Sequence, residues 1–225
     1  MKRRLAGSAV AGMVAASLLL TACSSDGEGD EGAAAPIEGA DGAGEATSEP
    51  EPEETAEDPT PEDDDIDRPE IRLPEDLNLI FDKPEVEEAD EAAVLVDAEW
   101  QVKSIYEVIS YHDVEGSSVS FYTQGQALLE NMEMLDRILE RGITTSGEIR
   151  YYDYEVNILP GEAAVLTYCR DFTGSVTHDF STREVVQEAD PDALPTRYVA
   201  RLEKGDQGVW QTVEEELERE SSQCL

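Results

Sequence analysis

Residues 152–158 read Tyr-Asp-Tyr-Glu-Val-Asn-Ile, so that apolar or aromatic side chains alternate with polar ones. Successive side chains of a β-strand point to opposite faces, and this period of two therefore predicts a half-buried strand. Pro160 and Gly161 follow as turn residues. The C-terminal half then reads as an antiparallel meander, with further strands predicted at 164–172, 176–180, from Tyr198, and at 209–214.

The sequence before this meander has the period of a helix. Apolar residues recur at spacings of three and four between Ala92 and Ile109, which predicts a helix over 84–112 with one buried face. A second helix is predicted to open at Thr123 with a capping box and to end before Gly142, which suits a left-handed cap. Helices followed by an antiparallel sheet predict an α+β fold.

This order of elements resembles the nuclear-transport-factor-2-like superfamily. The resemblance implies a cone-like fold in which two or more N-terminal helices pack in the concave face of a curved antiparallel sheet. It is closer to a group of lipid-anchored extracellular proteins of actinobacteria, which has no agreed activity to transfer. It covers roughly 71–225 and rests on Cys224 and on segments such as Leu-Pro-Glu-Asp-Leu at 73–77, Phe-Tyr-Thr at 121–123, Gly-Glu-Ile-Arg-Tyr-Tyr-Asp at 147–153, Thr-Tyr-Cys-Arg-Asp at 167–171 and Gly-Val-Trp-Gln-Thr-Val at 208–213.

The N-terminus has the pattern of a bacterial lipoprotein signal. Basic residues at 2–4 precede an apolar run at 5–20, which is too short for a comfortable membrane span. Leu-Thr-Ala-Cys at 20–23 then fits the lipobox. We therefore expect residues 1–22 to be a cleaved signal peptide and Cys23 to carry the lipid. The alternative is an ordinary signal peptide with an incidental cysteine.

Residues 23–70 differ in composition from the rest of the chain. Between positions 26 and 70 there are 19 acidic residues and one basic residue, Arg68. So little apolar surface cannot offset the entropy of ordering, and we expect a disordered acidic tether. It would hold a domain at 71–225 outside the cell membrane, on the extracellular face. The alternative is a tail that binds basic partners or divalent cations.

Acidic charge also dominates the predicted domain. The whole chain carries a formal net charge of −37, and residues 90–225 contain 28 acidic and 10 basic side chains. Phosphate binding requires the opposite sign, so nucleic acid is excluded as a partner. The expected partners are the membrane, through the lipid, and an envelope protein or a small apolar ligand.

Two cysteines remain once Cys23 is assigned to the lipid. Outside the cytoplasm Cys169 and Cys224 are expected to pair, because two such cysteines most often form a disulfide. A bridge that closes a loop of about 55 residues stabilises by roughly 4 kcal/mol in the loop-entropy treatment. It would fix the polar C-terminal tail on the sheet. Two free thiols are the alternative, and no metal site is expected because too few ligands are available.

No residue is assigned a catalytic role from the sequence. His112 and His178 each precede an aspartate, but His178 lies on a predicted strand, where the next side chain points to the other face. His112 suits the end of the first helix, where a histidine meets the dipole. Superfamily enzymes use an aspartate or a tyrosine in the hollow of the cone, which nominates Asp153 or Asp171, although neither lies in a matching motif.

Four tyrosines are the remaining candidates. Tyr152, Tyr154, Tyr168 and Tyr198 would rim an apolar pocket if they lie on the concave face, and core tyrosines with satisfied hydroxyls are the alternative. We predict that the domain is not an enzyme, uses no cofactor, and is a binding or interaction module of the cell envelope. The alternatives are a binder of a small apolar ligand and an isomerase-like or cyclase-like enzyme.

We expect Cys23→Ala to abolish membrane retention, because no other segment of the sequence has the length of an apolar span. Cell fractionation and mass spectrometry check this, with Ser24→Ala as the matched control. Acyl mass on a Cys23→Ala protein that still pellets with membranes would place the anchor elsewhere.

Overall fold

The computed structural model describes residues 66–225, and within this range the chain forms three α-helices and six strands. The predicted signal peptide, the predicted lipid site Cys23 and the predicted tether up to residue 65 lie outside the described residues. The helices are α1 (Ala89–Tyr111), α2 (Val119–Tyr122) and α3 (Gly125–Glu140). The strands are β1 (Leu77–Phe81), β2 (Ile143–Leu159), β3 (Ala163–Asp179), β4 (Val185–Gln187), β5 (Thr196–Lys204) and β6 (Trp210–Glu218).

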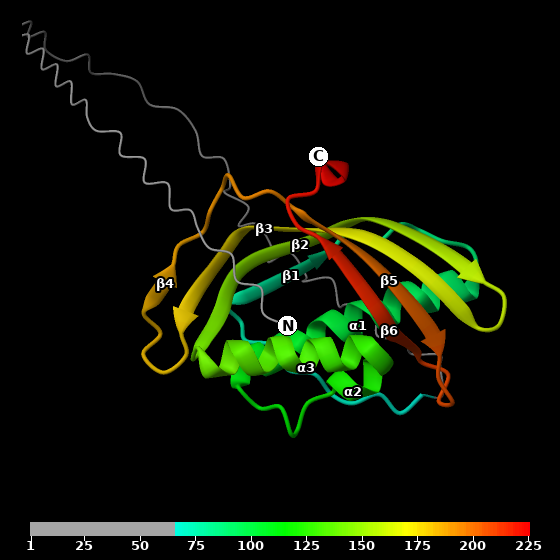
Figure 1. Cartoon of the computed structure of the whole chain (residues 1–225), viewed down its shortest axis with the longest axis horizontal. Coiled ribbons are helices and arrows are strands. Elements are labelled where there is room, and N and C mark those ends of the chain that lie inside the picture. Colours follow the sequence, from blue (N-terminus) through cyan, green and yellow to red (C-terminus); the bar gives the residue numbers. More distant parts are fainter. Residues whose placement is uncertain (1–65) are drawn as a thin grey trace, which may run out of the picture. The chain divides into compact units, whose positions relative to one another are not determined.

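The strands form one sheet in the order β1-β2-β3-β5-β6, and β4 pairs with β3 beside this path. β1 runs parallel to β2, and the other neighbours are antiparallel. Figure 1 shows the sheet curving over α1 and α3, which lie on its concave side. The predicted α+β class, with helices in the concave face of a curved sheet, is therefore confirmed. The sequence analysis missed β1, the short α2 and β4.

Helix α1 is the central element of the core. Its side chains Leu95, Ala98, Val102 and Ile109 are buried at the predicted helical spacing, and Val94 is buried as well. The helix ends in the left-handed conformation of His112 (φ 55°), whose N–H donates to the carbonyl of Val108 at 2.8 Å. No helix among the described residues is long and apolar enough to cross a bilayer.

The predicted capping box of the second helix is wrong. Helix α3 begins at Gly125, and the preceding Thr123 and Gln124 are extended. Thr123 forms an isolated bridge with Thr212, and the N–H of Gln124 donates to the carbonyl of Thr212 at 2.9 Å. Thr123 and Gln124 therefore pair with β6 and do not form the first turn of the helix.

Strands β2 and β3 are 17 residues long and bend together. Gly147 has φ 85°, and a Cβ at this position would lie 2.3 Å from the carbonyl oxygen of Gly174. The register shifts next to this contact, between Glu148 and Arg150. The predicted break between strands near residue 174 is therefore wrong, because Gly174 lets the two backbones approach and β3 continues through it.

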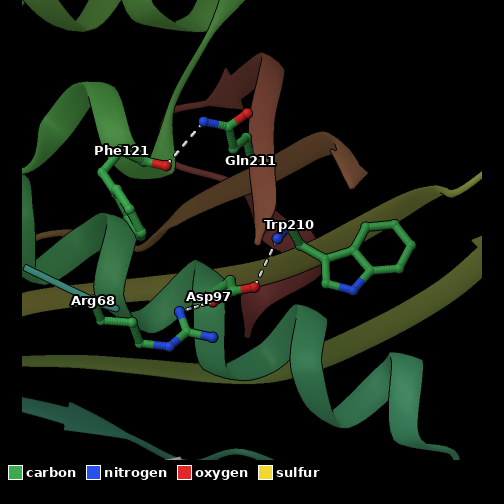
Figure 2. A network of polar contacts seen from close by, with 5 residues as sticks. All are labelled: Arg68, Asp97, Phe121, Trp210 and Gln211. Atoms are coloured by element: carbon green, nitrogen blue, oxygen red, sulfur yellow. Dashed lines mark hydrogen bonds and ion pairs between the residues drawn. The ribbon is translucent and has the colours of Figure 1, made fainter. Parts of the chain in front are cut away.

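Residues before β1 are fixed to the domain by a buried carboxylate. Figure 2 shows Asp97 of α1 between the Arg68 guanidinium, with which it forms an ion pair, and the main-chain nitrogen of Trp210. That nitrogen donates to Asp97 Oδ2 at 2.7 Å, and the neighbouring Gln211 donates to the carbonyl of Phe121 at 2.9 Å. Arg68, which the sequence analysis placed in the tether, thus contacts the core of the domain.

The C-terminus is attached to the opposite side of the sheet from the helices (Figure 1). A disulfide joins Cys169 of β3 to Cys224 of the 3-10 helix η1 (Ser222–Cys224), with the Cα atoms 5.8 Å apart. The Tyr152 hydroxyl donates to the carbonyl of Cys224 at 2.8 Å. Two contacts to the sheet therefore hold the tail.

We expect Gly147→Ala to destabilise the domain more than Gly161→Ala. Both glycines have positive φ, at 85° and 84°, but a Cβ at Gly161 meets nothing within 4 Å. Conformational strain alone costs roughly 1–2 kcal/mol, and the clash at Gly147 adds roughly 1–3 kcal/mol. Chemical denaturation of both variants measures the difference. Equal losses would show that the close contact between β2 and β3 is unimportant.

Candidate functional site

A cavity of about 540 Å³ lies between the concave face of the sheet and the helices α1 and α3. This volume is typical of small-molecule sites. The helices contribute an apolar wall that includes Val102, Ile105, Ile109, Met134 and Ile138. The sheet contributes aromatic and charged groups, which include Tyr151, Tyr168, Arg170, Tyr198 and Glu215.

The aromatic wall is centred on Tyr168 and Tyr198. These residues are register partners on β3 and β5, and their rings stack with centroids 4.9 Å apart. Burial raises the pKa of Tyr198 to about 12 and raises the pKa of Tyr168 and Tyr151 well above the ordinary value. All three are therefore neutral phenols at neutral pH, with hydroxyl groups that can donate hydrogen bonds.

The structure brings only part of the predicted tyrosine set into the cavity. Tyr168 and Tyr198 line it, Tyr154 stacks against Tyr168 at 5.5 Å without lining it, and Tyr152 bonds to Cys224 on the other face. The cause is an irregularity at Asp153, which has φ 58°, where the register shifts between Tyr152 and Glu155. Strict alternation therefore fails at this point.

Two tyrosines that were not predicted as cavity residues line the cavity. Tyr151 lines the cavity from the sheet, since it precedes the irregularity. Tyr106 lines it from α1, one turn after Val102. The helical spacing could have identified Tyr106, whereas nothing in the sequence marks the shift that turns Tyr151 inward.

Glu215 is a functional candidate that the sequence analysis missed. Its neighbours Glu214 and Glu216 are exposed, but Glu215 is half-buried and accepts a hydrogen bond from the Tyr168 hydroxyl at 3.1 Å. Burial raises the pKa of the Glu215 carboxyl. A carboxyl beside a phenol in a cavity is an arrangement that can exchange protons with a bound molecule.

Arg170 supplies the positive charge closest to this aromatic wall. It lies half-buried on β3, and its guanidinium sits over the Tyr198 and Phe172 rings, 5.3 Å from each centroid. Within residues 66–225 no carboxylate forms an ion pair with it, and its buried Nε has no hydrogen-bond partner. The cation therefore lies on the cavity wall without a carboxylate partner among these residues.

The other candidates from the sequence have structural contacts and do not line this cavity. His112 Nε2 lies 2.9 Å from the carbonyl of Ile143, and its ring stacks on Phe180. His178 Nε2 lies 2.7 Å from the Ser146 hydroxyl. Asp171 accepts the N–H of Thr173 at 2.8 Å, and Asp153 is exposed at the irregularity of β2. The carboxylate that the sheet contributes to the cavity is Glu215, not Asp153 or Asp171.

No known protein family matches this chain, and no curated protein matches its sequence. Solved structures match at low similarity. A ketosteroid isomerase-like protein from Erwinia carotovora atroseptica shares 15% identity over 60% of this chain and 99% of its own, with a TM-score of 0.39. A protein from Novosphingobium aromaticivorans whose name refers to scytalone dehydratase shares 12% over 58% and 86%, with a TM-score of 0.39. The intermembrane space region of the chloroplast protein ARC6 shares 12% over 60% and 99%, with a TM-score of 0.40.

The domain has an α+β fold, with a curved, unclosed sheet around its helices. The prediction that it is not an enzyme is contradicted, because two of the similar structures have names that refer to enzymes. Those names describe the neighbours, and at such low identity the likeness concerns the fold alone.

We expect Glu215→Gln to gain stability relative to the wild-type protein as the pH rises. The raised pKa means that the folded protein binds the Glu215 proton more tightly than the unfolded chain does. The contribution of this group is therefore full below the unfolded pKa of about 4.3 and is lost as the pH rises through the folded pKa. Denaturation at several values between pH 4 and pH 8 measures the change, with Glu216→Gln as the exposed control. A difference between the two variants that does not depend on pH would contradict this assignment.

Proposed function

We propose that this protein is a lipid-anchored, extracellular ligand-binding protein whose domain receives a small, partly apolar molecule between α1, α3 and the sheet. The observation that carries the proposal is the cavity of about 540 Å³, in which aliphatic side chains of α1 and α3 lie beside polar and aromatic groups of the helices and the sheet. Small-molecule sites combine apolar surface with placed polar groups, and this cavity has both.

The position of the exposed lining residues supports access from solvent. Glu130, Glu133 and Arg137 are exposed on α3, and Leu217 and Arg219 are exposed at the end of β6 and just after it. An opening between these two elements would admit a ligand without separating the sheet from α1. The more deeply buried Tyr168 and Ile109 would then contact the ligand body.

The lipoprotein signal and the acidic segment support the proposed location. The lipobox at 20–23 would place a lipid on Cys23, and the segment after it would hold the domain away from the bilayer. The resemblance to actinobacterial lipoproteins agrees with this arrangement. A domain displayed in this way meets small molecules before they reach the membrane.

The neutral fluorophore 1-aminoanthracene tests the cavity, because its emission rises in apolar surroundings. The full chain carrying Cys23→Ala, handled without detergent, should bind it saturably. Met134→Trp fills the cavity from α3 and should weaken binding roughly tenfold or more, since overfilling costs about 1–3 kcal/mol. Leu129→Trp places the same side chain on an exposed position of α3 and should bind as the parent does.

Absence of saturable binding in the parent protein, with the domain folded by circular dichroism, would contradict the proposed function. Equal affinity of the Met134→Trp and Leu129→Trp proteins would place the fluorophore outside this cavity and would also count against it.

A further inference from the structure

Three nitrogen atoms on the cavity wall have no hydrogen-bond partner in the structure, although all are buried. They are Gln101 Nε2 on α1, Asn131 Nδ2 on α3 and Arg170 Nε on β3. The residues Gln101 and Asn131 are only 3% and 7% exposed. A buried polar group without a partner is destabilising, and the great majority of such groups in folded proteins have one. Other buried side-chain atoms without a partner, such as Ser110 Oγ and Thr144 Oγ1, lie away from the cavity, but these three belong to residues that line it, which points to a ligand that supplies hydrogen-bond acceptors.

Arg170 differs from most basic residues of the described chain because no carboxylate forms an ion pair with it. Arg150 pairs with Asp82, Arg183 with Asp76 and Lys204 with Asp90. Arg170 forms no such ion pair within residues 66–225, in a chain that has 53 acidic residues and only 16 Lys and Arg residues. A half-buried guanidinium that avoids an ion pair amid so many carboxylates is available to bind an anion.

The carboxylates on the cavity wall do not use this capacity. Glu130 accepts a hydrogen bond from Gln126 at 2.7 Å, and Glu133 lies 4.0 Å from Arg137, both on the exposed surface of α3. Glu215 is engaged by the Tyr168 hydroxyl, and it interacts electrostatically with Arg170 without forming an ion pair with it. The inner part of the cavity therefore offers a cation and amide groups that the protein's own acids leave unoccupied.

We propose that the cavity recognises a small carboxylic acid with an aromatic or apolar body, whose carboxylate binds the Arg170 guanidinium. This inference rests on the proposed function and names its ligand class. The planar guanidinium presents N–H groups that match the two oxygens of a carboxylate. The stacked Tyr168 and Tyr198 rings and the aliphatic side chains of α1 would contact the body of the molecule. The amides of Gln101 and Asn131 would make additional polar contacts from the helices.

A matched pair of probes tests the charge requirement. In 2-naphthoate and 2-naphthalenemethanol the same ring carries a carboxylate or a neutral hydroxymethyl group. Displacement of 1-aminoanthracene from the full-length Cys23→Ala chain gives both affinities. We expect 2-naphthoate to bind roughly tenfold or more tightly, because a hydrogen bond to a charged group contributes about 1.5–3 kcal/mol.

Two arginines on adjacent strands provide the variant and its control. Arg170→Gln should abolish the preference for 2-naphthoate while 1-aminoanthracene still binds, which shows that the cavity is intact. Arg197→Gln removes the same charge from β5, where Arg197 pairs in register with Cys169 and does not line the cavity. That variant should keep the preference, and Arg170→Lys should keep part of it, since the charge remains but the planar fork is lost.

Equal affinities of the full-length Cys23→Ala chain for the two probes would overturn the proposal while leaving the proposed function standing, provided that 1-aminoanthracene binds. A preference for 2-naphthoate that survives Arg170→Gln would also overturn it, because the anion would then bind elsewhere. Failure of all three molecules to bind would instead remove the proposed function itself.

Discussion

The bend that β2 and β3 share determines both the shape of the domain and the composition of its cavity. Gly147 and Gly174 bring the two backbones together without side chains between them, next to a shift in the strand register. Further along β2, the left-handed Asp153 shifts the register and exchanges the faces of the following residues. Without the first feature the sheet would not curve around α1 and α3. Without the second, a different tyrosine would face the helices.

The helices need their own attachment, since a curved sheet alone does not fix their position. Asp97 provides it, because one buried carboxylate holds the chain before β1 through Arg68 and the start of β6 through Trp210 (Figure 2). Removing one member of such a contact leaves the buried charge uncompensated, which is strongly destabilising. On the other side of the sheet the disulfide fixes the tail. The Asp97 contacts and the disulfide therefore hold the chain around the concave side, and the cavity remains open there.

Periodicity predicted the elements well where local pattern and tertiary structure agree. The spacing of apolar residues identified α1 and most of α3, and alternation identified parts of β2, β3, β5 and β6. It failed where a contact distant in sequence decides the outcome. Thr123 leaves its expected helix for β6, Gly174 continues a strand, and β1 pairs with β2 across 70 residues of sequence. Tyr168 and Tyr198 were found as cavity residues, but Glu215 lies in a run of acids and only burial separates it from its neighbours.

The acidic domain repels a carboxylate ligand over a longer distance than the distance over which Arg170 attracts it. Residues 90–225 carry 28 acidic and 10 basic side chains, so the long-range field of the domain repels an approaching carboxylate. That field decays over about 8 Å at physiological ionic strength. Inside the cavity the surroundings are less polar, and the attraction of Arg170 for an anion is correspondingly stronger. Selection would therefore depend on contact within the cavity and not on steering from a distance. An acidic surface with Arg170 inside the cavity would discourage anions that are too large to enter, because they would meet only the repulsion.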